Sequence, residues 1–492
     1  MAWVPNLLLT LFSLSITHTF ASSLPSIYEI YEHFRVNLSP GTQLFLPNYS
    51  TYANEITPRW TTFEPPSYTI AVKPSMESDL QKIIRYAAKH RVPFLGTGGG
   101  HGYTTTTSML RNGIDIDLGN FNAVDVDVKS ETITIGGSVI FDDVFDPLYN
   151  AKKEIQIGYC SCVGVVGATL GGGIGPLQGL HGLVADALIS VRIVTANGDA
   201  LTASESENRD LFWAIRGAGA NFGIIVSATY RIFDSTNGGN ALAADFLFPA
   251  SENISVFRAM ESYTRKQPDA FSISSAITWS SDLNQSVIQL STIYYGDMDQ
   301  GMVYNRPFLN SNPIVQNISV LPWNLLTKQN RFGADAVGCI KGRAHSLYSL
   351  NIYSMSIPAY LRVFDSFSSF FLKYPELRNT LFVTEIHPRN AVLRIPDDST
   401  AYPFRNTTAY TFFDFILPDA KSSSTVDEFM QGILRVLGDA SGNPDRQTYV
   451  NYARGNEGPR AWYTDKKLGR LRTLKKKWDP QGLFSFTNGV NT

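Results

Sequence analysis

The sequence predicts an α+β protein, with a glycine-rich domain followed by a sheet-and-helix domain, and three features of the chain support this fold class. Short strand patterns alternate with glycine-rich loops up to about residue 234. From about residue 235, aromatic strands and amphipathic helices follow, and the chain ends in a helical segment. With 492 residues, 43% of them hydrophobic, the chain can form two or three domains around a large core.

The first half contains one clear amphipathic helix and several strands. Residues 78–90 place their apolar side chains on one helical face, and Ser78 with Gln81 forms a capping-box pattern. Alternation of apolar and polar residues predicts half-buried strands at 114–118, 123–128 and 132–136. A longer strand is predicted at 187–198, and residues 208–233 read as a helix, a glycine turn and a strand.

The second half begins after a plausible linker at 234–240. A helix is predicted around 255–266, strands at 286–296 and 409–417, and a final helix that stops at Asp479-Pro480. We therefore expect a first domain over 22–234, with its core at 63–234, and a second domain over 235–444. Residues 445–492 form a return segment.

The N-terminus has the pattern of a secretory leader. The apolar stretch from Leu7 to Ile16 is too short to span a bilayer, and Thr19 and Ala21 offer small residues for cleavage. We expect 1–21 to be a signal peptide; the alternative is a buried N-terminal helix. Six N-x-S/T triplets favour entry into the secretory pathway and predict N-glycans at Asn37, Asn48, Asn253, Asn284, Asn317 and Asn406. The expected location is secreted or lumenal.

The charge balance excludes some partners. The formal net charge is −2 without long single-sign blocks, which gives no support for nucleic-acid binding or a polybasic membrane role. The run Lys475 to Lys477 is interpreted as the solvated face of a helix. No stable membrane span is predicted.

The chain has three cysteines, Cys160, Cys162 and Cys339. This number does not make a disulfide scaffold, and a bridge between Cys160 and Cys162 would be strained. An odd number of thiols in an oxidising compartment suggests that at least one sulfur is bonded to something else.

Two glycine-rich loops carry a histidine and a cysteine: GTGGGHGY at 96–103 and IGYCSCVGVVGATLGGGIG at 157–175. A Rossmann dinucleotide site needs G-x-G-x-x-G between a strand and a helix, but His101 stands where the third glycine belongs. Pro176 also argues against a continuous helix after the second loop. The glycines therefore predict loops whose backbone N–H groups cradle an anion, rather than a helix N-terminus.

These loops belong to a larger set of motifs that resembles a known family. With GLVADALISVRIVTANGD, DLFWAIRGAGANFGIIVSATYRIF, YVNYARG and WYTDKKLGRLRTLKKKWDPQGLFSF, the chain is similar to the berberine-bridge-enzyme-like flavin oxidases. These have the vanillyl-alcohol-oxidase-type, or PCMH-type, FAD-binding fold. The matches cover 63–234 and 449–486, while 235–445 matches loosely. The resemblance implies a two-lobed FAD-binding domain, and a substrate domain whose antiparallel sheet covers the flavin.

The resemblance implies FAD held by two covalent bonds, one from His101 to the 8α-methyl carbon and one from Cys160 to C6. Taken alone, His101 would be a polar loop residue and Cys160 a buried structural thiol, and Cys162 could compete for the flavin. Val163 matches the position that gates oxygen in relatives, or is an ordinary core valine. The expected cofactor contacts are His101, Cys160, Thr97, Gly98, Gly99, Gly100, Gly102, Tyr103, Val163, Gly164, Gly167, Gly171, Gly172, Gly173, Gly175 and Asn451.

A proton acceptor is also needed, because a substrate that gives a hydride to flavin N5 usually loses a proton as well. Tyr452 matches the tyrosine that acts as base in some relatives, and this role calls for positive surroundings that stabilise a phenolate. A family glutamate falls at Thr411 here, so that acid is missing. Glu385 and His387 could substitute, or could be a polar pair at a strand edge.

No metal site is predicted, since His181 has no second ligand at suitable spacing and reads as a loop histidine. The expected activity is oxidation of a small organic substrate, a secondary metabolite, with O2 as acceptor and hydrogen peroxide as product. The apolar pocket is expected to involve Tyr294, Tyr295, Tyr410 and Phe412. The alternatives are a carbohydrate oxidase of the same fold, and a non-redox protein that keeps flavin as structure.

Overall fold

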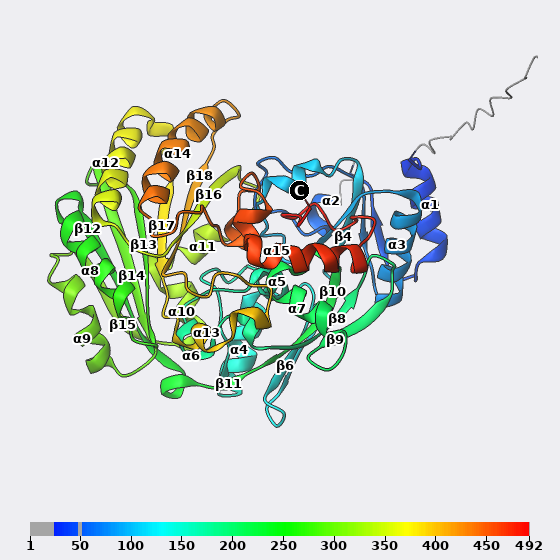
Figure 1. Cartoon of the computed structure of the whole chain (residues 1–492), viewed down its shortest axis with the longest axis horizontal. Helices are drawn as coiled ribbons and strands as arrows, with labels where there is room; N and C mark the ends of the chain where they lie inside the picture. Colours follow the sequence, from blue (N-terminus) through cyan, green and yellow to red (C-terminus); the bar gives the residue numbers. More distant parts are fainter. Residues whose placement is uncertain (1–23, 48–51, 492) are drawn as a thin grey trace, which may run out of the picture.

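The computed structural model describes residues 24–47 and 52–491. The predicted signal peptide 1–21 and the triplet at Asn48 lie outside the described residues. The described chain forms two lobes (Figure 1), each with its own sheets and its own buried cluster of apolar side chains. None of its helices is both long and apolar enough to cross a bilayer.

Over the described residues, the first lobe contains three sheets. One sheet has the spatial order β1 (Gln43–Phe45), β2 (Tyr68–Lys73), β4 (Gly113–Asp117), β3 (Phe94–Thr97), and its last three strands run parallel. The second is antiparallel, with the order β5 (Val124–Asp127), β6 (Thr132–Gly136), β10 (Ile224–Arg231), β8 (Leu188–Val194), β9 (Ala200–Ser204). A short pair joins β7 (Lys153–Glu154) to β11 (Phe233–Asp234).

The helices of the first lobe pack around these sheets. They are α1 (Ile27–Asn37), α2 (Tyr52–Glu55), α3 (Glu77–His90), α4 (Phe141–Asn150), α5 (Val165–Gly171), α6 (Gln178–His181) and α7 (Arg209–Ala218). The predicted helix at 78–90 is α3, but its capping box is wrong, because Met76 is the N-cap and Ser78 lies inside the first turn. Glu77 and Asp79 supply the negative charge that favours a helix N-terminus.

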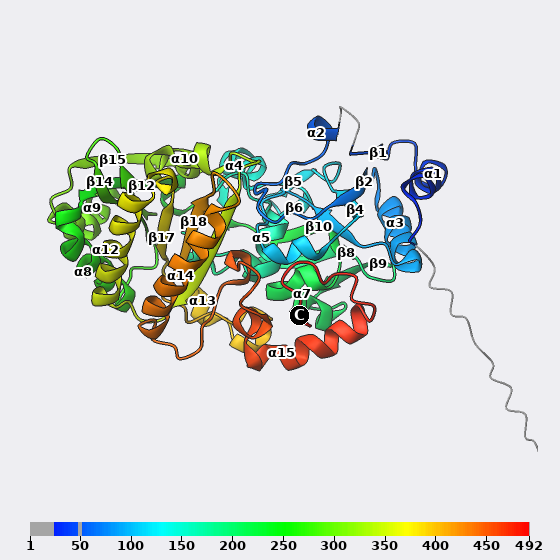
Figure 2. The same ribbon diagram turned by 90° about the horizontal axis from the view of Figure 1, so that it is seen from above.

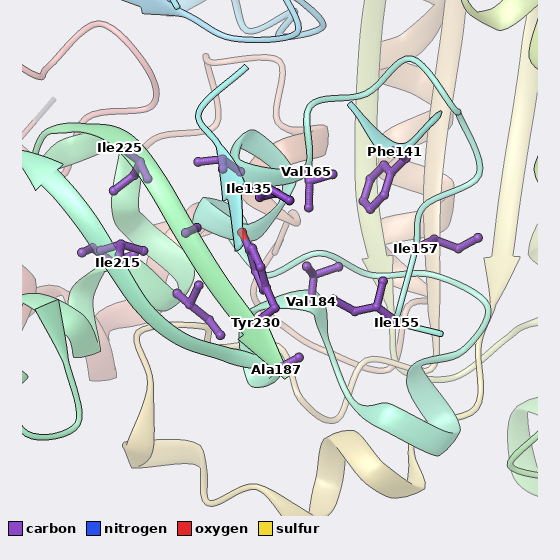
Figure 3. Close-up of a cluster of buried hydrophobic side chains, with 14 of the residues drawn as sticks. Ile135, Phe141, Ile155, Ile157, Val165, Val184, Ala187, Ile215, Ile225 and Tyr230 are labelled. Carbon is purple, nitrogen blue, oxygen red and sulfur yellow. The ribbon is translucent and has the colours of Figure 1, made fainter. Parts of the chain in front are cut away.

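The core of the first lobe lies where the second sheet, α5 and the loop before α5 meet. Figure 3 shows Ile135, Ile225 and Tyr230 of the sheet near Val165 at the start of α5. The Tyr230 hydroxyl is buried and lies 2.9 Å from the Thr169 hydroxyl of α5. This packing holds α5 on the sheet.

The second lobe contains one seven-stranded antiparallel sheet. Its spatial order is β15 (Val315–Pro322), β12 (Asn240–Pro249), β14 (Gln285–Tyr294), β13 (Phe271–Ser280), β17 (Leu381–Ile386), β18 (Ala409–Ile416), β16 (His345–Ile352). One face is covered by α8 (Asn253–Arg265), α9 (Met298–Leu309), α12 (Ile357–Lys373) and α14 (Ser422–Asp439), as Figure 1 shows. The other face, called the inner face below, is turned toward the first lobe (Figures 1 and 2).

Strand alternation decides which side chains reach the inner face. Phe382, Phe413 and Phe415 pack against the helices, so the residues between them point the opposite way. The short helices α10 (Trp323–Gln329), α11 (Asp335–Gly338) and α13 (Asn390–Arg394) lie in the connections between strands.

The C-terminal segment returns to the first lobe. In both views α15 (Pro459–Trp478) runs beside α7 (Figures 1 and 2), and its Trp462 and Leu471 are buried in the first lobe's core. The expectation that Lys475 is solvated is wrong, because its side chain is 1% exposed. Three consecutive residues of a helix cannot share one face, so one of the three lysines points inward.

Candidate functional site

The two glycine-rich loops touch each other. A Cβ on Gly99 would lie 2.8 Å from the backbone N of Gly164, and one on Gly98 would lie 2.8 Å from the carbonyl oxygen of Gly137. Gly100 has φ +70°, a conformation that favours glycine. These glycines let the loop of His101 approach the loop of Cys160 more closely than side chains would allow.

Part of the second loop is helical, which corrects the expectation of a loop throughout. Gly164 is the N-cap of α5, and Val165, Val166 and Thr169 anchor this short helix on the core. Pro176 does fall outside any helix, between α5 and α6. Buried packing on one side of α5 outweighs the low helix propensity of its glycines.

Some of the predicted glycines face open space, whereas others pack against protein. Gly102 and Gly167 are exposed, and a Cβ on either would have no atom within 4 Å. The other predicted glycines of the second loop pack against protein, because a Cβ on each would meet Asn451, Tyr402, Val184 or the Ile157 carbonyl. They are Gly171, Gly172, Gly173 and Gly175. The two glycine-rich loops, 96–103 and 157–175, are called the cradle below; Gly102 and Gly167 are the positions in them where the backbone is open.

His101 lies at this cradle as a neutral imidazole. Its ring stacks on Trp60 with centroids 4.7 Å apart, and its buried Nε2 has no hydrogen-bond partner. Burial, with a contribution from the nearby Lys341 ammonium, lowers the pKa of His101 to about 4. A neutral ring nitrogen keeps the lone pair that a covalent bond needs.

Three residues near His101 were not predicted from the sequence to belong to the site. Trp60 stacks on a second imidazole, His345, at 3.8 Å between centroids, and His345 Nδ1 lies 2.9 Å from Asp414 Oδ1. The predicted contact Tyr103 also has a buried hydroxyl without a partner. Trp60, His345 and Asp414 come from distant parts of the chain, and no local pattern connects them.

The structure shows the bonding state of the three cysteines, all of which lie within the described residues. Cys162 is disulfide-bonded to Cys339, and Cys160 is the free thiol. Cys162 therefore has no thiol with which to compete for a ligand. Burial raises the pKa of the Cys160 thiol, while the guanidinium of Arg331 acts in the opposite direction.

Other predicted contacts are occupied by protein partners. The Thr97 hydroxyl donates to Asp115 Oδ1 at 2.7 Å, and the Asn451 side-chain amide donates to the Ala168 carbonyl at 2.9 Å. Val163 is half-buried and packs against the first lobe's core. His181 lies 2.7 Å from Glu154 and stacks on Phe233, which is a structural environment.

The predicted catalytic residues come together on the inner face. The Tyr452 hydroxyl donates to Glu385 Oε2 at 2.9 Å, and His387 Nε2 lies 3.7 Å from the same oxygen. Both ring nitrogens of His387 are buried without a hydrogen-bond partner. Glu385 and His387, for which a polar pair at a strand edge was the alternative, therefore form a buried cluster with Tyr452.

The charge around Tyr452 differs from the expectation. In place of a cation that would stabilise a phenolate, the structure puts a carboxylate beside the hydroxyl. Burial first, and then Glu385, raises the pKa of Tyr452 well above its ordinary value. Tyr452 is therefore a neutral phenol that can pass its proton to Glu385.

Strand alternation also corrects the expected lining. Thr411 faces the helices, and its hydroxyl donates to the Leu350 carbonyl, so this position cannot present an acid to the inner face. Tyr294 also faces the helices, where it packs on Tyr304. Tyr295 is buried in the first lobe's core cluster.

Two of the expected lining residues do lie on the inner face. Phe412 packs against Tyr452 with centroids 5.1 Å apart. The Tyr410 hydroxyl lies 2.7 Å from the Tyr402 hydroxyl.

The geometry fits a flat, polar cofactor bound along the cradle. The buried polar atoms of His101 and Tyr103 lack partners within the protein. Buried polar groups normally have partners, so these atoms point to a bound group. Among the described residues, no three His, Cys, Asp or Glu side chains gather as they would around a metal ion.

Comparisons with known proteins agree with this site. Residues 68–204 match the family described as FAD binding domain, and 448–491 match the family described as berberine and berberine like. The FAD-linked oxidoreductase azaL of Aspergillus niger is 41% identical over 446 residues, which cover 90% of this chain and 94% of that protein. The FAD-linked oxidoreductase tazL of Aspergillus terreus is 36% identical over 458 residues, with 93% of each chain covered.

Solved structures show the same fold. The BBE-like 1 protein of Physcomitrella patens superposes with a TM-score of 0.82 at 22% identity, covering 95% of this chain and 99% of that one. A xylooligosaccharide oxidase from Myceliophthora thermophila has a TM-score of 0.80 at 22% identity, with the same coverage. Because the match to the curated relatives extends over nine-tenths of the chain, the protein belongs to the berberine-bridge-enzyme-like FAD-linked oxidoreductases.

Proposed function

We propose that the chain is an oxidase whose FAD is held by two covalent bonds, to His101 and to Cys160. The supporting observation is the convergence of two nucleophiles on one cradle: the loops of a neutral imidazole and of the free thiol are in contact. Bound FAD would supply the two-electron acceptor that O2 reoxidises, with release of hydrogen peroxide.

The proton of the reaction would leave through Tyr452 and Glu385. Because the pKa of Tyr452 is raised, its hydroxyl is not ionised before the reaction. Tyr452 would therefore take the substrate proton only while it gives its own proton to Glu385. The 2.9 Å hydrogen bond already holds that second proton in place. His387 lies beside the carboxylate with two free ring nitrogens and can hydrogen-bond the substrate.

The substrate that suits this site is a small organic molecule with a hydroxyl group. The hydroxyl would reach Tyr452, while Phe412 and Tyr449, both 5.1 Å from the Tyr452 ring, would contact apolar parts of the molecule. This lining favours an aromatic secondary metabolite.

An oligosaccharide is the second candidate, because the inner face also carries polar groups. Ser349 and Asn351 of β16 and Asp414 of β18 share that face with Glu385. Structures of the same fold are described as xylooligosaccharide and chitooligosaccharide oxidases.

We also propose entry into the secretory pathway. The Cys162–Cys339 disulfide suits an oxidising compartment. The predicted glycosylation positions that are exposed are Asn37, Asn284, Asn317 and Asn406; Asn253, at the start of α8, is half-buried. A drop in mass after glycosidase treatment, and a mature N-terminus near residue 22, would support this proposal. A full-length, unglycosylated chain would oppose it.

Anaerobic mixing of the purified holoenzyme with a panel of aromatic alcohols and oligosaccharides tests the activity. An oxidase loses its flavin absorbance with one class of compound, regains it with O2 and forms one peroxide for each turnover. A flavin that stays oxidised with every compound would favour the third reading, in which flavin is structural only. Loss of absorbance with sugars alone would favour the oligosaccharide.

A further inference from the structure

A segment of the second lobe, residues 331–339, lies along the loop that carries Cys160. It includes a short turn at 331–333 and the helix α11. A Cβ on Gly338 would lie 3.6 Å from the Cys160 sulfur, and the Gly338 carbonyl accepts a hydrogen bond of 2.7 Å from Trp60. This segment, called the strap below, therefore adjoins both Cys160 and the ring stacked on His101.

Three residues of the strap bind the loop around Cys160 at successive positions. Asp335 accepts hydrogen bonds from the backbone N and the hydroxyl of Ser161, at 2.8 and 2.7 Å. Cys339 is bonded to Cys162. Arg331 donates to the carbonyl of Tyr159, the residue before Cys160, and its positive charge lowers the pKa of the Cys160 thiol. Asp335 and Cys339, at the two ends of α11, are four residues apart, which places them on one side of this short helix.

Arg331 is held in place beside the loop that carries Cys160. Its backbone N and that of Phe332 donate to the two oxygens of the buried Asp245, at 2.9 and 2.8 Å. Its guanidinium lies 4.9 Å from the centroid of the Tyr159 ring, and its buried Nε has no hydrogen-bond partner. Both Arg331 and Phe332 have positive φ, a costly conformation that the contacts with Asp245 maintain.

We propose that the strap selects Cys160 as the thiol that bonds the flavin: Arg331 stabilises its thiolate, and Cys339 removes the competing thiol of Cys162. The inference rests on the bicovalent attachment proposed above. It assigns Arg331 and Cys339 as positioning residues.

The attachment step balances with O2 as the oxidant. The Cys160 thiol gives up its proton, and its sulfur forms a bond to C6 of the oxidised flavin. The hydrogen on C6 leaves as a proton, and the electron pair stays on the ring, which becomes reduced. O2 then takes two electrons and two protons to give hydrogen peroxide, so that the oxidised, linked flavin is restored.

The charges that face Cys160 explain why a cation is needed. Burial raises the pKa of the thiol, and the carboxylates of Asp335 and Glu385 raise it further. Arg331 is the group that lowers it. Without Arg331 less thiolate is present at neutral pH, and the thiolate returns as the pH rises.

The test compares full-length wild type with Arg331→Gln and Arg331→Lys by peptide mass spectrometry. We expect Arg331→Gln to keep the His101 link and to form the Cys160 link at least about tenfold more slowly at pH 7, since one pKa unit is tenfold in thiolate. Incubation in air at pH 9 should restore the link, and Arg331→Lys should keep much of it. A wild-type rate in Arg331→Gln would overturn the role of Arg331.

A second pair of variants tests selection. Cys339→Ala should place flavin on both Cys160 and Cys162, whereas the double variant Cys162→Ala/Cys339→Ala, which has no second thiol, should place it on Cys160 alone. Flavin confined to Cys160 in Cys339→Ala would contradict selection by the disulfide. If wild type itself carries no Cys160 link, the proposed bicovalent attachment is wrong. If wild type is linked, the results with the variants test only the role of the strap.

Discussion

In the proposed reaction Glu385 and Tyr452 share one proton path, and neither is suited to act alone. The phenol has a raised pKa and needs an acceptor, while the carboxylate reaches substrate only through the phenol. His387 stands beside them with unused ring nitrogens. The proposal thus puts the acceptor on β17, whereas the family pattern indicated Thr411 of β18.

Replacement of Glu385 by Gln should slow reduction of the flavin by about 10² to 10⁴-fold, because the amide accepts the hydrogen bond but not the proton. Tyr452→Phe should slow it similarly while keeping the contacts with Phe412 and Tyr449. Both variants should stay yellow. Stopped-flow absorbance under anaerobic conditions measures the rate, and a loss of less than about threefold in Glu385→Gln would show that another group takes the proton.

Asp115 supplies a pH-dependent prediction. Burial raises its pKa to about 7, and Thr97 donates to it. The folded state therefore holds a proton that the unfolded state has already lost, so this contribution to stability is present at low pH and is lost as the pH rises through about 7.

Asp115→Asn, which mimics the protonated acid, should be more stable than wild type near both pH 5 and pH 8, because the unfolded carboxyl is already ionised at pH 5, and its advantage should be roughly 2–3 kcal/mol larger near pH 8. Urea unfolding at the two pH values measures this difference. Equal differences at both values would mean that Asp115 is ionised in the folded protein throughout.

At the residue scale, local motifs led to the prediction of His101, Cys160 and Tyr452, because each lies inside a recognisable run of the sequence. Arg331 and Cys339 could not be found in this way. Cys339 pairs across 177 residues, and Arg331 acts through an equally distant contact. Only the folded chain shows which cysteine is free.

At the scale of elements, α5 forms the floor of the cradle. Gly167 faces open space, as does Gly432 in the middle of α14. Gly167→Val should fold normally and bind little or no flavin, because its side chain would fill the cradle. The matched control Gly432→Ala should bind flavin fully and gain about 0.5–1 kcal/mol of stability. The flavin absorbance of each folded protein measures the bound cofactor. A fully yellow Gly167→Val would show that the flavin does not bind against α5.

The C-terminal helix α15 offers another matched pair. The Lys475 ammonium donates to Asp479 at 2.7 Å and to the carbonyls of Asn221 and Phe484 at 2.8 Å. Lys475→Ala leaves a buried carboxylate unpaired and should cost about 3–5 kcal/mol in urea unfolding. Lys476→Ala, on the exposed side, should cost less than about 0.5 kcal/mol. Similar values for both would mean that Lys475 is solvated.

Elements were easier to predict than the direction of their side chains. The pattern at 409–417 predicted a strand, and β18 is there. A run such as AYTFFDFIL is apolar on both faces, so periodicity could not tell that Tyr410 and Phe412 face the site while Thr411 faces the helices. The choice depends on which layer packs on the sheet.

At the scale of the whole molecule, the site exists only where the two lobes meet. In the proposed site, the first lobe supplies the cradle with His101 and Cys160, and the inner face of the seven-stranded sheet supplies Glu385. The texture of the sequence changes near residue 235, shortly before β12, the first strand of the second lobe's sheet, begins at Asn240. The strap crosses back from the second lobe to the first, which no change in composition signals.

The central claim is that one flavin is bonded to both loops of the cradle. Wild-type protein should be denatured in acid, digested and analysed by mass spectrometry. We expect the yellow colour to stay with the polypeptide and a single flavin to join the peptide of His101 to that of Cys160. Release of all the flavin into the supernatant, or a colourless protein, would contradict the account.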